Sequence, residues 1–96
     1  MLKRYMARRV DRCLHALAAS GALRMRPAKK QGQVYLAGPE GGYSSSVLLF
    51  DLATAKWQDK RTDGSGQTLF SAMRRLGVPL DLVTAALVAD SKGGHQ

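Results

Sequence analysis

Residues 23–37 have the sequence LRMRPAKKQGQVYLA and mark the point where the pattern of the chain changes from helical to extended. Two apolar side chains alternate here with two arginines: Leu23, Arg24, Met25 and Arg26. This period of two is typical of a strand with one buried face. Pro27 ends the run, and the segment 29–32 (KKQG) has the composition of a turn before the next extended run. These residues predict a β-hairpin that carries cations on one strand and at its tip.

The preceding residues have a helical period. On a helical wheel six apolar residues share one arc: Leu2, Met6, Val10, Cys13, Leu14 and Leu17. Arg4, Arg8 and Arg12 fall on the opposite side together with His15, and Gly21 is a candidate C-terminal cap. The pattern predicts an amphipathic helix of about seventeen residues with an apolar stripe and an arginine ridge.

A second hairpin is predicted after the first. Residues 44–50 are rich in β-forming side chains, and a turn at 51–54 separates them from residues 56–58 (KWQ). The loop 62–66 (TDGSG) follows, in which Asp63 or Ser65 can cap a helix.

Two helices are predicted in the last third. Apolar residues at helical spacing mark the first of them: Leu69, Phe70, Met73 and Leu76. Pro79 suits the first turn of the second, whose expected inward residues are Leu80, Val83, Leu87 and Val88. The whole chain is therefore expected to be an α+β domain over residues 1–92, with a flexible tail at 93–96. Its elements are an N-terminal amphipathic helix, two β-hairpins that form a small antiparallel sheet, and two C-terminal helices.

The charge is unevenly distributed. The net charge is +8, and residues 1–34 hold nine Lys and Arg against Asp11 alone, which already gives +8. Residues 35–96 hold six cations and six anions and sum to zero. Charge that served only solubility would be spread more evenly, so the distribution indicates an electropositive patch and favours a polyanionic partner.

Signals for catalysis, metal binding and membrane insertion are absent from the sequence. It contains no GxSxG, no phosphate-binding glycine loop and no HExxH, and its one cysteine and two histidines lack partners at ligand spacing. No apolar run approaches the roughly 20 residues that span a bilayer. We therefore expect a cytoplasmic, non-enzymatic protein without a cofactor or metal, and without a membrane partner.

Residues 38–85 resemble the zinc-finger domain at the front of bacterial and phage-type DNA primases. Gly38-Pro39-Glu40-Gly41 stands where that family has its first Cys-Pro-x-His knuckle, and a strand pair follows. Trp57-Gln58-Asp59 then leads into residues 62–67 (TDGSGQ), similar to the metal-free variant of plasmid and phage primase-helicase proteins. All four zinc ligands are missing, and Gln67 replaces the acid that ends the motif.

The resemblance implies a small antiparallel sheet flanked by helices, with single-stranded or template DNA across its open face. On that face Tyr35, Tyr43 and Trp57 would stack bases, and Lys56, Lys60 and Arg61 would hold the backbone. The charge distribution instead favours the first helix and the first hairpin as the contact surface.

Two functions remain open from the sequence. The first is a small basic nucleic-acid-binding protein of phage or plasmid type, with DNA and RNA not distinguished. Its candidate contact residues are Arg4, Arg8, Arg12, Arg24, Arg26, Lys29, Lys30, Trp57, Lys60 and Arg61. The alternative is a mobile-element inhibitor or adaptor, for example of anti-CRISPR type, that binds a larger host protein or nucleoprotein complex. Both functions need the same basic patch.

Overall fold

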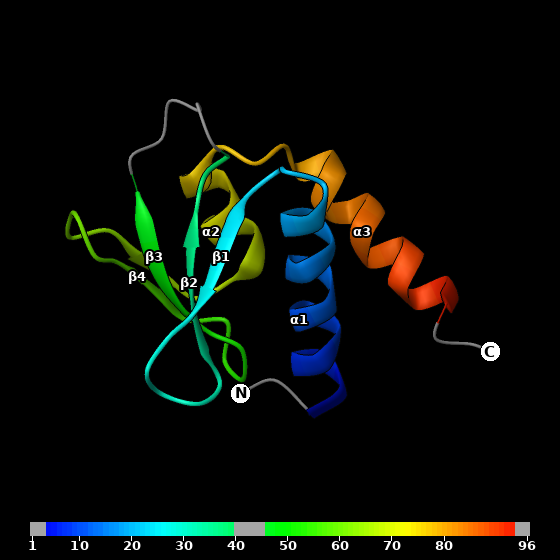
Figure 1. Cartoon of the computed structure of the whole chain (residues 1–96), viewed down its shortest axis with the longest axis horizontal. Helices are drawn as coiled ribbons and strands as arrows, with labels where there is room; N and C mark the ends of the chain where they lie inside the picture. Colours follow the sequence, from blue (N-terminus) through cyan, green and yellow to red (C-terminus); the bar gives the residue numbers. More distant parts are fainter. Residues whose placement is uncertain (1–3, 40–45, 94–96) are drawn as a thin grey trace.

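The computed structural model describes residues 4–39 and 46–93; of residues 4–6 and 90–93 only the helical backbone is described. These residues contain three helices and five strands, which Figure 1 shows in their spatial arrangement. In chain order they are α1 (Arg4–Ala19), β1 (Arg24–Pro27), β2 (Gln33–Ala37), β3 (Val47–Asp51), β4 (Trp57–Asp59), β5 (Ser65–Gly66), α2 (Leu69–Leu76) and α3 (Leu80–Gly93). The α+β class and the order of helix, sheet and two helices agree with the sequence prediction.

The strands form one antiparallel sheet in the order β1-β2-β3-β4-β5, so each strand pairs with its neighbour in the chain. The two predicted hairpins are thus joined through β2 and β3, where Tyr35 lies opposite Leu49. The predicted loop at 62–66 contains the short strand β5, because Ser65 pairs with Gln58 of β4. The predicted strand residues 44 and 45 lie outside the described residues.

Helix α1 buries the predicted apolar stripe. Val10, Cys13, Leu14 and Leu17 are buried in the core, whereas the side chains of Leu2 and Met6 lie outside the described residues. The helix ends at Ala19, and Gly21 adopts a left-handed φ of +86° that a side chain would disfavour. The turn therefore redirects the chain from α1 into β1.

The two C-terminal helices differ from the prediction in detail. Thr68, not Asp63 or Ser65, caps α2, because its hydroxyl accepts a hydrogen bond from the Ser71 backbone N–H. Phe70 belongs to the apolar residues that predicted α2 but is 42% exposed, whereas the adjacent Leu69 is buried. Leu80 and Val88 of α3, at 39% and 46% exposed, also face outward, because only the arc around Val83 meets the core.

The core lies between one face of the sheet and the helices. Val34 and Leu36 of β2 and Leu48 and Phe50 of β3 point into it, while the alternate residues point to the other face. Helix α2 lies behind the sheet, α1 runs beside β1, and α3 packs on α1 (Figure 1). Among the described helices, none has the length and apolarity to cross a membrane.

Candidate nucleic-acid interface

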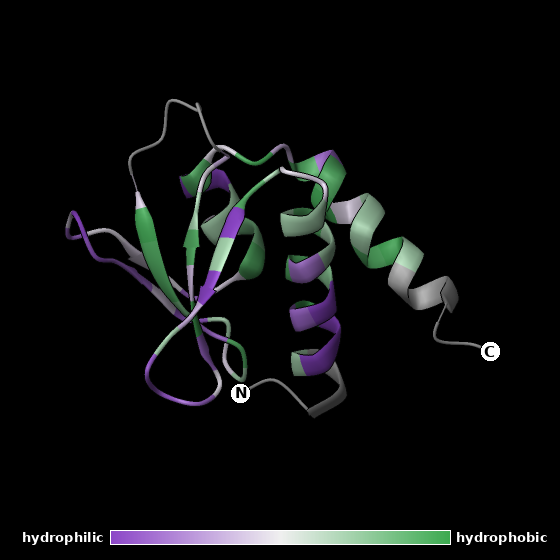
Figure 2. Cartoon of the chain, viewed as in Figure 1, coloured by the Kyte–Doolittle hydropathy of each residue, from purple (hydrophilic) through white to green (hydrophobic). Residues whose placement is uncertain are grey.

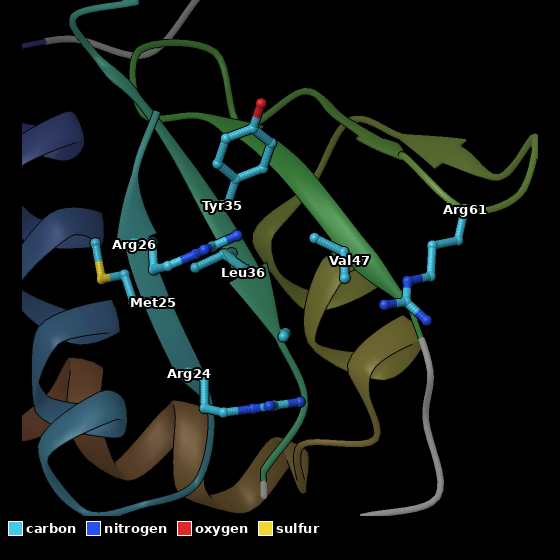
Figure 3. Close-up of a pocket in the computed structure, with 8 residues that line it drawn as sticks. Arg24, Met25, Arg26, Tyr35, Leu36, Val47 and Arg61 are labelled. Atoms are coloured by element: carbon cyan, nitrogen blue, oxygen red, sulfur yellow. The ribbon is translucent and has the colours of Figure 1, made fainter. Parts of the chain in front are cut away.

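The face of the sheet away from the core carries arginines. Arg24 and Arg26 of β1 are exposed on it, and Arg26 pairs in register with Tyr35 of β2. Figure 3 shows these side chains and Arg61, which follows β4, around one hollow. The hollow measures about 440 Å³ and is lined by Arg24, Met25, Arg26, Tyr35, Leu36, Ala37, Val47 and Arg61. The lining thus contains three guanidinium groups, one aromatic ring and no acid.

Local contacts orient this surface. Arg24 Nε donates a hydrogen bond to the Gly38 carbonyl oxygen at 2.8 Å, so its side chain reaches across the end of β2. The two β1 arginines lie on one face because residues two apart on a strand point the same way. Tyr35 shares that face through its register with Arg26. An aromatic ring among cations is an arrangement that suits a nucleobase and its phosphates.

The two acids of the strands, Asp51 and Asp59, accept hydrogen bonds from other groups. Asp51 Oδ1 accepts hydrogen bonds from the backbone N–H groups of Ala53 and Thr54, at 2.8 and 3.3 Å, in the turn after β3. Asp59 is 1% exposed and points into the protein. Neither carboxylate lines the hollow that the arginines surround.

The predicted arginine ridge lies on α1 beside the sheet. Arg8 and Arg12 are exposed, whereas the side chain of Arg4 lies outside the described residues. Arg9 is directed differently, because its Nη2 donates to the Leu87 carbonyl oxygen of α3 at 3.1 Å. Figure 2 shows hydrophilic residues along α1 and β1. Helix α1, which carries the ridge, lies beside β1, which carries Arg24 and Arg26.

The remaining predicted cations are exposed around the sheet. Lys29 and Lys30 lie in the turn between β1 and β2, and Lys60 and Arg61 follow β4. The sequence analysis predicted two alternative contact surfaces: the first helix with the first hairpin, or the open face of the sheet. The fold instead puts Arg24, Arg26 and Arg61 around the same hollow.

Trp57 is not on this surface. It is 7% exposed and lies on the core side of β4, where its Nε1 donates to Ser71 Oγ of α2 at 2.9 Å. A Cβ on Gly66 would lie 2.6 Å from the indole ring, so only glycine fits beside it. The ring is therefore engaged in packing, and no base can stack on it in this conformation. Tyr43, the other aromatic residue expected to stack, lies outside the described residues.

Asp59 forms a buried anchor between β4 and α2. Its Oδ2 accepts from Arg75 Nε at 3.1 Å, and its Oδ1 accepts from the Arg61 backbone N–H at 2.9 Å. Burial by itself raises the pKa of this carboxyl. Hydrogen bonds from the Arg61 backbone, Ser46, Arg75 and Thr62 outweigh burial and hold the pKa well below its usual range. Asp59 is therefore ionised at neutral pH.

The residues that carry the primase resemblance thus have tertiary contacts of their own. Trp57 and Asp59 attach the strands to α2, and a Cβ on Gly64 would lie 2.5 Å from the Arg75 guanidinium. Within residues 4–39 and 46–93, no three His, Cys, Asp or Glu side chains are grouped to hold a metal ion. Cys13 is buried, with Sγ 4.0 Å from the Val83 carbonyl oxygen.

Comparison with known proteins adds no assignment. No protein-family model, curated protein or solved structure matches the chain.

The pairing of Tyr35 with Arg26 was not predicted from the sequence. Tyr35 was named there only because of the primase resemblance, and its position beside Arg26 depends on the strand register. The signal available was the period of two in both strands, which gives the face of each residue but not its cross-strand neighbour.

Proposed function

We propose that this chain is a small, non-catalytic nucleic-acid-binding protein whose contact surface combines the open face of the sheet with the exposed side of α1. The observation that carries the proposal is the hollow on the open face, where Arg24, Arg26 and Arg61 surround Tyr35 and no acid intervenes. Arginine binds phosphate oxygens bidentately, and an exposed aromatic ring stacks on unpaired bases. A single-stranded DNA or RNA segment fits this chemistry best.

A salt titration tests the proposal. Binding of a labelled single-stranded oligonucleotide should weaken with salt, with a log–log slope near −0.7 for each neutralised phosphate. The double variant Arg24→Gln/Arg26→Gln should flatten this slope by about 1.4 if both arginines contact phosphates.

A matched control removes the same charge elsewhere. Arg74→Gln/Lys92→Gln takes two cations from α2 and α3 and should leave the slope nearly unchanged. Equal slopes for the two double variants would show that net charge alone, and not the open face, governs binding.

We infer a second candidate function from the two C-terminal helices. Four large apolar side chains of α2 and α3 are exposed: Phe70, Leu80, Leu82 and Val88. Such residues favour a protein partner, as expected of an inhibitor or adaptor of a host nucleoprotein complex. In a pull-down from host lysate, this function requires that a partner survives nuclease treatment and is lost on Leu82→Lys. Loss of the partner on nuclease treatment alone favours direct nucleic-acid binding.

A further inference from the structure

A second hollow lies between α1 and β1. It measures about 370 Å³ and is lined by Asp11, His15, Ala18, Met25, Arg26, Pro27 and Val34. Four of these residues are apolar and three carry polar or charged side chains. Met25 and Arg26 line both this hollow and the one on the open face, so both hollows border β1. The volume is at the low end for ligand sites and suits one flat ring rather than a helix or a duplex.

His15 lies beside the acid of this hollow. Its Nδ1 lies 2.9 Å from the Asp11 carbonyl oxygen and 3.3 Å from Asp11 Oδ1. A carbonyl oxygen only accepts hydrogen bonds, so Nδ1 carries the proton. The Asp11 side chain remains 40% exposed, which leaves carboxylate oxygen available to a ligand. The carboxylate thus lies at the hollow and remains accessible.

Asp11 is an acid in an otherwise basic segment of the chain. It is the only acid among residues 1–34, which hold nine cations. A carboxylate inside a phosphate-binding surface repels phosphates and weakens binding. The same carboxylate strengthens binding if it accepts a hydrogen bond from the exocyclic amine of a base, as acidic side chains do with cytosine N4. An unpaired base is required, because a hollow of about 370 Å³ admits a single base but not a base pair.

We propose that the hollow between α1 and β1 holds one unpaired cytosine, with Asp11 accepting from its exocyclic amine and Arg26 facing the adjacent phosphate. The site rests on the proposed nucleic-acid binding and adds a base preference to it. The apolar lining, Met25, Pro27 and Val34 included, takes the faces of the ring, and the preference applies equally to DNA and RNA because both present the same amine.

The test compares labelled 12-residue oligonucleotides of dC, rC and dT by fluorescence anisotropy at pH 7.5 and fixed salt. Wild-type protein should bind dC and rC more tightly than dT by roughly tenfold, the scale of a base-edge contact. Asp11→Ala should act in opposite directions: it weakens binding to dC by removing the acceptor, and it tightens binding to dT by removing a negative charge. The ratio of the two dissociation constants should fall toward one.

A matched control is Asp63→Ala, which removes an exposed acid from the loop between β4 and β5 and raises the net charge equally. This variant should keep the dC-to-dT ratio of the wild type. If Asp11→Ala tightens binding to dC and dT by the same factor, Asp11 acts through charge alone and the base site is wrong. Wild-type protein that binds none of the three oligonucleotides overturns the proposed function itself, and the base site with it. A thermal melt of Asp11→Ala confirms that the variant is folded.

Discussion

Arginine and aromatic residues lie on both faces of the sheet, but their contacts differ between the two faces. On the core side, Arg75 binds the buried Asp59, and Trp57 packs beside Gly66 with its N–H on Ser71. On the open side, Arg24 and Arg26 lie at a hollow without an acid, next to an accessible tyrosine. An arginine or aromatic residue therefore indicates a binding surface only when its face and partners are known. The difference yields predictions that separate stability from binding.

The largest expected effect is on stability, from Trp57→Ala. Removing a buried indole should lower the free energy of unfolding by about 3–5 kcal/mol, because it leaves a cavity between β4 and α2. Denaturant unfolding followed by circular dichroism measures the loss. The fraction of protein that remains folded should bind oligonucleotides as the wild type does, since the ring lies on the core side. A folded variant that loses tenfold or more in affinity would instead place Trp57 in the contact surface.

Asp59→Asn should have the next largest effect. The variant leaves Arg75 without its counter-charge and weakens the hydrogen bonds to the loop after β4. Breaking a fully buried ion pair typically costs 3–5 kcal/mol, and the partial exposure of the Arg75 side chain (37%) reduces this to about 2 kcal/mol. Denaturant midpoints at neutral pH measure the difference. A variant as stable as the wild type would show that Asp59 anchors nothing.

The same carboxylate predicts an acid dependence. The pKa of Asp59 lies below its ordinary value of 3.8 in the folded protein, so the unfolded chain binds the proton first as the pH falls. The stabilisation is fully present above about pH 5 and is lost progressively as the pH falls below 4. Unfolding free energies measured from pH 6 to pH 2 should decline more steeply for the wild type than for Asp59→Asn. Parallel curves would contradict the depressed pKa.

The positions of these groups show what a sequence can and cannot predict. The 3.6-residue and two-residue periods predicted α1, the first hairpin and both C-terminal helices, because each depends on local patterning. They did not predict the burial of Asp59, since its ion partner Arg75 lies sixteen residues along the chain. Alternation places Trp57 and Asp59 on one face of β4 but does not tell which face is covered. The helix that covers this face is α2, which follows β4 in the chain.

A smaller effect is expected on the binding side from Arg4, Arg8 and Arg12 of α1. Replacing all three with alanine should flatten the salt slope of single-strand binding by about two units if each contacts a phosphate. A thermal melt checks that the triple variant is folded. An unchanged slope would confine the contact surface to the open face of the sheet.

The smallest effect is expected from metal removal. Since the chain lacks the zinc ligands of the primase family, a chelator should leave the melting temperature unchanged, and elemental analysis should find no stoichiometric zinc. Calorimetric melts with and without chelator measure this. A melt that shifts on chelation would reveal a site that includes Cys13 or His15.

The strand order also has a consequence for the rate of folding. Every strand of the order β1-β2-β3-β4-β5 pairs with its neighbour in the chain, so the sheet assembles by closing short loops in turn. Proteins rich in such local contacts fold faster than those built on distant strand pairs. The hydrogen bond of Arg9 with the Leu87 carbonyl oxygen joins α1 to α3 across 78 residues. We therefore expect the docking of α1 on α3 to limit folding, so that a mutation in their contact slows refolding more than an equally destabilising one at the edge strand β5.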